Sequence, residues 1–161
     1  MRLAVIFVLV VLVPSLCFAQ KVDMGGSDKA SSPIALLVRK LRSDDVRRIQ
    51  IVQIPPRMLT RTRITPEMLE RAFSYKLIVS DIRGGAYAAS VTAAVASMSA
   101  KPTDEMGDLR WGVAFFDQNE QRIASFYFDR SGRRGAVDDL PVSFSGDMFK
   151  WLDKNFSDAF K

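Results

Sequence analysis

The chain has 161 residues with a single cysteine and no histidine, and it carries 23 Lys and Arg against 18 Asp and Glu, a net charge of +5. Without histidine, Ser-His-Asp and Cys-His catalysis are excluded and zinc sites lose their usual ligands, so no cofactor is predicted. The length suits one domain that can bury a core without disulfides, and the basic excess favours anionic partners.

Residues 1–19 have the layout of a cleaved secretory signal: positive Arg2, an apolar run over 3–13, and small residues before the cleavage point. The run is shorter than the ~20 residues that span a bilayer, which favours cleavage over anchoring and predicts no transmembrane segment afterwards. Cleavage leaves 22 basic residues against 18 acids, a net charge of +4. We therefore expect a periplasmic or secreted protein without a nucleic-acid partner. Lipid attachment at Cys17 is the alternative, disfavoured by bulky Leu16.

Residues 20–32 are rich in glycine and serine and predict a flexible tether, after which 33–161 are expected to form one α+β domain. The first helix of the domain is predicted to begin at Pro33. Its buried face follows from apolar residues at helical spacing, namely Ile34, Leu37, Val38 and Leu41.

The pattern over 47–54 predicts a strand, with a bulge between Ile51 and Val52 where the apolar alternation shifts phase. A second helix is predicted from the capping sequence Thr65-Pro66-Glu67. Its expected buried residues are Met68, Leu69, Ala72 and Phe73. A further strand over 75–82 and an alanine-rich helix over 86–98 follow, and then a polar loop over 100–108.

Residues 109–117 and 122–129 predict a hairpin of two aromatic strands, and 136–144 supply the third strand of a C-terminal meander. Because 109–117 is apolar on both faces, it is expected to be central and covered on both sides, or else to meet a partner with one face. A last helix starts near Ser145. The fold class predicted is α+β, with a mixed or antiparallel sheet of about five strands packed by three to four helices.

Two groups of arginines are candidate binding residues. Arg57, Arg61 and Arg63 lie in a loop bounded by prolines, and Arg133 and Arg134 lie at a hairpin tip. Their guanidinium groups suit bidentate binding of phosphate or carboxylate. The alternative is a solvated surface with local salt bridges.

The aromatic group of the hairpin contributes two further candidates, Trp111 and Tyr127. Core packing is the alternative explanation for them. Three consecutive aromatics, Phe126 to Phe128, must point to both faces of their strand, which offers one face to a ligand or a protein.

The preferred hypothesis is a non-enzymatic binding protein of the periplasm whose partner is a protein or an anionic envelope component. An inhibitor or immunity-type protein is one version of it. The alternatives are a carboxylate-dependent cell-wall hydrolase and an envelope-associated structural module. Acids suited to a hydrolase all fall at strand ends or turns, where turn chemistry alone explains them. They are Asp104, Glu105, Asp108, Asp117, Asp129, Asp138 and Asp139.

Overall fold

The computed structural model describes residues 26–160, which form an α+β fold of one seven-stranded antiparallel sheet and four α-helices. The predicted fold class is confirmed, although the sheet has more strands than the five expected. The predicted signal peptide, 1–19, and the first part of the predicted tether lie outside the described residues.

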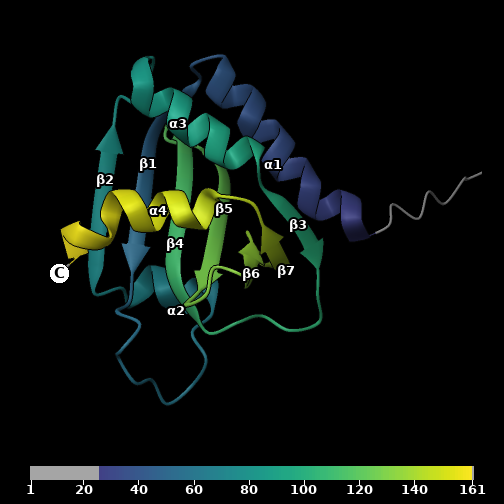
Figure 1. Cartoon of the computed structure of the whole chain (residues 1–161), viewed down its shortest axis with the longest axis vertical. Coiled ribbons are helices and arrows are strands. Elements are labelled where there is room, and N and C mark those ends of the chain that lie inside the picture. Colours follow the sequence, from purple (N-terminus) through teal and green to yellow (C-terminus); the bar gives the residue numbers. More distant parts are fainter. Residues whose placement is uncertain (1–25, 161) are drawn as a thin grey trace, which may run out of the picture.

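The strand order in the sheet is β2-β1-β4-β5-β6-β7-β3, so β2 and β3 are its edges (Figure 1). The elements in chain order are α1 (Gly26–Arg42), β1 (Val46–Gln53), α2 (Pro66–Arg71), β2 (Tyr75–Ser80), α3 (Gly85–Ala96), β3 (Ser99–Pro102), β4 (Leu109–Asp117), β5 (Arg122–Asp129), β6 (Arg134–Val137), β7 (Leu140–Ser145), α4 (Met148–Phe156) and the 3-10 helix η1 (Ser157–Phe160).

Three helices, α1, α3 and α4, cover one face of the sheet (Figure 1). The main core lies between them and the strands, where side chains such as Leu37, Val91, Phe115 and Leu152 are buried. The short helix α2 covers part of the opposite face. There Leu69 joins a second, smaller apolar cluster on that side of the sheet. Both layers meet at the central strands, so the sheet is sandwiched where it is most apolar.

The two covered faces explain the strand patterns. All of β4 from Leu109 to Phe116 is buried, which confirms the prediction of a central strand covered on both sides. Ile51 and Val52 are likewise both buried because they point into the two opposite clusters. The predicted bulge between them is therefore wrong. The irregularity of β1 lies at its start, between Val46 and Arg48.

Two helices differ from their predictions. α1 begins at Gly26, so Pro33 lies inside the helix, and residues 26–32 are helical where a tether was expected. The Thr65 cap of α2 is confirmed, since its hydroxyl accepts a hydrogen bond from the N–H of Met68 at 3.3 Å. Met68 itself is exposed, contrary to the prediction, because the single face of this short helix that meets the sheet carries Leu69.

The extra strands are short and lack a strong apolar pattern. β3 lies within the predicted polar loop and pairs antiparallel with β7, and Ala100 is its one buried residue. β6 and β7 divide the segment that was predicted as the third strand of the meander. Among residues 26–160, none of the helices is both long and apolar enough to span a membrane.

Candidate functional site

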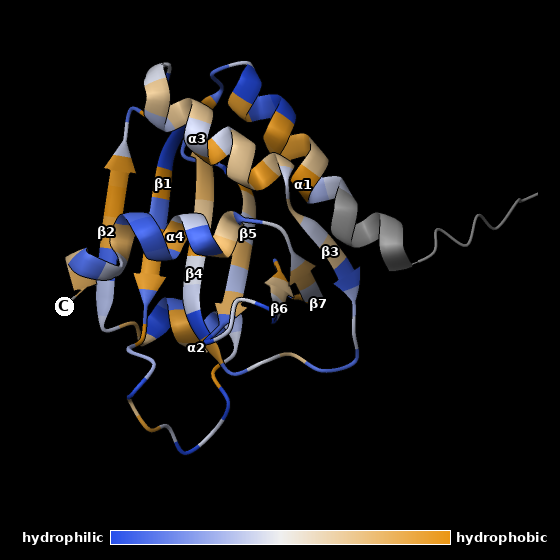
Figure 2. Ribbon diagram, viewed as in Figure 1, coloured by the Kyte–Doolittle hydropathy of each residue, from blue (hydrophilic) through white to orange (hydrophobic). Residues whose placement is uncertain are grey.

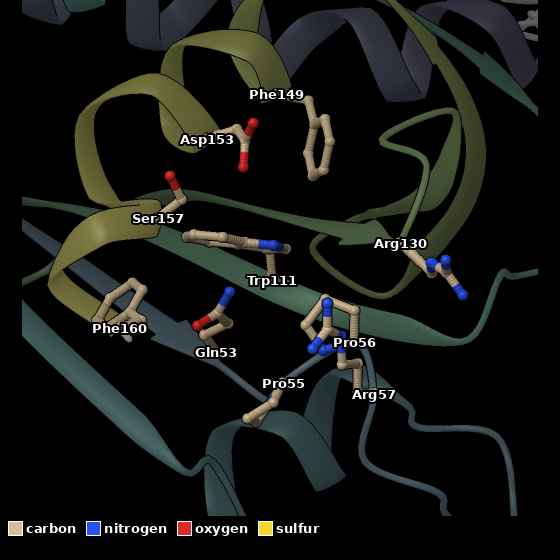
Figure 3. A pocket seen from close by; sticks show the side chains of 10 residues that line it. All are labelled: Gln53, Pro55, Pro56, Arg57, Trp111, Arg130, Phe149, Asp153, Ser157 and Phe160. Carbon is tan, nitrogen blue, oxygen red and sulfur yellow. The ribbon is translucent and has the colours of Figure 1, made fainter.

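An open cleft of about 770 Å³ lies at the end of β1 and the start of β4 (Figure 3). Helix α4 and η1 form one side, and the chain that leaves β1 forms the other. The residues that line it are Gln53, Pro55, Pro56, Arg57, Trp111, Arg130, Phe149, Asp153, Ser157 and Phe160.

The pairing of β1 with β4 and β2 positions the residues of the inner wall of the cleft. Gln53 of β1 lies directly opposite Trp111 of β4, and Tyr75 of β2 lies opposite Gln53 on its other side. Phe160 of η1 stacks on Tyr75 and packs against Trp111, each with ring centroids 5.5 Å apart. Phe149 of α4 meets the Trp111 ring edge-on at 6.5 Å. These aromatic contacts fix the tryptophan ring in one orientation.

Two polar groups of this wall have no hydrogen-bond partner in the described chain, although the residues that carry them are mostly buried. Gln53 is 6% exposed and Trp111 is 3% exposed. Within residues 26–160, neither the Gln53 side-chain amide nor the indole N–H of Trp111 has a hydrogen bond to another group of the chain. In Figure 3 the amide points toward Trp111, and the indole nitrogen lies at the end of the ring nearer Arg130. Because no group of the described chain occupies them, both are available to a ligand in the cleft.

Two arginines stand at the mouth of the cleft. Arg57 directly follows Pro56, and Arg130 lies in the turn after β5. The fold brings these two distant parts of the chain to the same cleft. Both side chains are exposed, and neither forms an ion pair within the part of the chain that the structure describes. Asp153 on α4 faces them across the hollow (Figure 3). The cleft therefore presents two guanidinium groups, the indole N–H of Trp111 and the amide of Gln53. These groups suit a ligand in which an anionic group is attached to an apolar or planar group.

Local chemistry explains how these side chains are held. Pro55 and Pro56 end β1 because neither can donate a ladder hydrogen bond, and this turns the chain away at Arg57. The turn that carries Arg130 is closed by Asp129, whose carboxylate accepts hydrogen bonds from the backbone N–H groups of Ser131 and Arg133 at 3.0 and 3.1 Å. Asp129 therefore acts as a turn residue rather than as a free acid.

The structure separates the predicted binding residues. Arg57 and Trp111 share the cleft, whereas Arg61 and Arg63 lie further along the loop, exposed to solvent. Arg133 is exposed at its hairpin turn. Its neighbour Arg134 pairs with Glu105 at 3.3 Å.

Tyr127 lies on the opposite face of the sheet from Trp111, buried beneath α2. Its hydroxyl donates a short hydrogen bond to Glu70, which also pairs with Arg122 at 2.9 Å. Burial, and then the bond to Glu70, raise the pKa of Tyr127 above its usual range. This network ties α2 to the sheet.

The acids suggested for a hydrolase are mostly engaged in structural bonds. Asp117 accepts from the N–H groups of its own hairpin turn, and Asp138 accepts from Ser125. Asp108 and Asp129 line one shallow hollow of about 370 Å³ beside the loop. Asp108, however, is paired with Arg110 and accepts from the N–H of Ile64. The described residues contain no cluster of acids suited to a metal ion.

Several residues of the cleft were missed by sequence reasoning. Phe149 was assigned to the core from its helical spacing, and Gln53 was one of four polar positions within a predicted strand. The only signal at Gln53 was a polar residue on the otherwise apolar face of β1, next to a double proline. Arg130 and Asp153 carried no pattern at all.

Comparison of the chain with protein-family models, with curated proteins and with solved structures found no match in any of the three. The function of the cleft must therefore be inferred from its own geometry.

Proposed function

We propose that this is an exported, non-enzymatic binding protein, and that the cleft at Trp111 binds an anionic group of its ligand. The observation that supports this most is the pair of unpartnered polar groups on the cleft wall, the Gln53 amide and the indole N–H of Trp111, on two residues that are otherwise buried. The Gln53 amide lies between Tyr75 and Trp111 at an open cleft, where a ligand can hydrogen-bond to it.

The charges around the cleft favour an anion as that ligand. Arg57 and Arg130 supply two guanidinium groups with no partner in the described chain, against the single carboxylate of Asp153. A carboxylate or phosphate oxygen is what such donors bind best, and the aromatic wall offers contact for the apolar group attached to it. A carboxylate would come from a protein partner, as in an inhibitor or immunity-type role, and a phosphate from an envelope component.

A binding role suits the cleft better than catalysis. It contains one carboxylate, Asp153, so it lacks the paired acids that glycoside hydrolysis requires. Its groups are donors held by strand pairing and ring packing, which is the arrangement that gives orientation and specificity to a binding site.

Two-dimensional NMR of the indole N–H groups tests this directly, because the chain has only two tryptophans. The probes are N-acetylphenylalanine for a carboxylate and phenyl phosphate for a phosphate, with N-acetylphenylalanine amide as the uncharged control. We expect the Trp111 signal to shift with at least one anionic probe and not with the amide. The Trp151 signal serves as an internal reference, since its N–H donates to Ser90 at 3.1 Å.

Variants assign the contacts. Losing one charge-assisted hydrogen bond costs about 1.5 kcal/mol, so Arg130→Ser and Gln53→Leu should each raise Kd about tenfold. Arg39→Ser, an exposed arginine on α1, is the matched control and should leave Kd unchanged. The proposal is wrong if no anionic probe shifts Trp111, or if the uncharged amide shifts it as strongly.

A further inference from the structure

A second surface, which shares only Arg57 with the cleft, lies on the loop between β1 and α2. We call residues 57–63 the arginine loop. It hangs below the sheet, away from the helical layer (Figure 1), and Figure 2 shows a short apolar stretch between its polar residues. That stretch is Met58 and Leu59, which are 46% and 97% exposed. A leucine side chain exposed to this degree contributes no apolar burial to the stability of the fold.

The loop is nevertheless held in place. The N–H of Met58 donates to the carbonyl of Pro55 at 2.9 Å, and the carbonyl of Met58 accepts from Arg110 at 3.0 Å. Arg110 is anchored in turn by Asp108. Leu59 is thus presented outward by a hydrogen-bonded base, and its exposure does not come from a loose chain.

Positive charge surrounds this apolar tip. Arg57, Arg61 and Arg63 are all exposed, and none forms an ion pair within residues 26–160. No acid occurs in the sequence from Pro55 to Thr65 to balance them. The tip is therefore a pair of apolar side chains with unpaired guanidinium groups on both sides.

We infer that the arginine loop docks on an anionic lipid bilayer, with Leu59 and Met58 inserted below the headgroups and the arginines at headgroup level. The two features fit this partner together. Apolar side chains gain from the acyl boundary, while long basic side chains keep their charge at the anionic surface. An acidic protein surface would satisfy the arginines but would need a dedicated pocket for a leucine that stands this far out.

Vesicle flotation with the exported protein tests the inference, using vesicles of equal phosphatidylglycerol and phosphatidylcholine and vesicles of phosphatidylcholine alone. We expect binding to the anionic vesicles only, weakened by salt. Arg61→Ser with Arg63→Ser should lower the partition coefficient about 25-fold at low salt, about fivefold per arginine. Leu59→Ser should lower it about tenfold, the lower end of what burial of a leucine contributes. None of these positions lines the cleft, so the result is independent of the proposed function.

Matched variants act as controls. Ile78→Ser removes an exposed apolar side chain from β2, and Lys101→Ser with Lys154→Ser removes two exposed charges away from the loop; both should bind like the wild type. Every variant is prepared in the same exported form as the wild type, so differences in binding report on the loop. The inference is overturned if the wild type does not float with anionic vesicles. It is also overturned if Leu59→Ser binds like the wild type while the arginine variant does not, because the contact would then be purely electrostatic.

Discussion

Replacing Arg110 with methionine should release the arginine loop while leaving the sheet folded. Arg110 is one of the few buried charges, with 7% of its side chain exposed, and it joins the central strand to the loop. Methionine keeps most of the apolar stem of arginine and removes its hydrogen bonds. Arg110→Met therefore isolates the contribution of the guanidinium group.

The structure sets the magnitude of this change. The ion pair with Asp108 contributes about 1 kcal/mol. Its loss costs no more than this because 41% of the Asp108 side chain is exposed, so water solvates the carboxylate that the substitution leaves unpaired. The bond to the Met58 carbonyl contributes about 1.5 kcal/mol more. The contact of the Arg110 guanidinium with the Thr60 hydroxyl, at 3.5 Å, contributes little to stability. We expect a loss of about 2.5 kcal/mol in the free energy of unfolding.

Urea denaturation should show this as a shift of about 1 M in the midpoint. Limited trypsin digestion reports on the loop itself, because its arginines are exposed cleavage sites, and cutting there should accelerate in Arg110→Met. Arg48→Met is the control: Arg48 pairs with exposed Glu120 and lies over the Phe116 ring, away from the loop. A loop cut no faster in Arg110→Met than in wild type, with a loss below about 0.5 kcal/mol, refutes this account of Arg110.

Three further outcomes are expected. Replacing the loop arginines Arg57, Arg61 and Arg63 together with serine should leave the unfolding midpoint nearly unchanged in urea, since exposed charges contribute little to stability; a large loss would show that they are structural. The Tyr87 hydroxyl is buried with no partner among the described residues, and burial raises the pKa of Tyr87 from 10.0 to about 12. Because the folded-state pKa is the higher one, ionisation of Tyr87 leaves stability unchanged below pH 10 and lowers it as pH rises from about 10 to 12. Denaturation across this range should show a shallower fall for Tyr87→Phe, which should also gain about 1 kcal/mol at neutral pH; an unchanged profile would contradict the assignment. Gly135→Ala should abolish folding or cost more than about 3 kcal/mol by circular dichroism melting, since its Cβ would lie 1.8 Å from the carbonyl oxygen of Tyr127; a stable variant would show that β5 and β6 can separate.

The sequence carried enough information to predict the fold class, because local patterns determine elements. The apolar run of β4, the Thr65 cap and the apolar stripe of α1 each follow from neighbouring residues. Where a pattern was ambiguous, long-range packing decided it. Ile51 and Val52 looked like a bulge because a strand covered on both faces loses its alternation.

The cleft could not be predicted for the same physical reason. Gln53 and Trp111 are neighbours only because β1 pairs with β4, and Arg130 joins them only because β5 is next in the sheet. Strand order is a property of the whole chain and leaves no trace in the local pattern around any of these residues. Arg57 and Trp111 were both named from the sequence, but nothing there indicated that they would meet.

The strand order also sets the sequence in which the sheet can assemble. The described part of the chain up to the end of β3, residues 26–102, contains one strand pair that it can complete alone, β1 with β2. On the other side of β1, Ile49 and Ile51 pair with Phe115 and Val113 of β4. Strand β3 cannot pair until β7 is present. The meander from β4 to β7 is built from adjacent hairpins and is expected to form first, as the nucleus onto which β1 and β3 add. A chain that emerges with its N-terminus first therefore cannot complete this sheet until its last third is released.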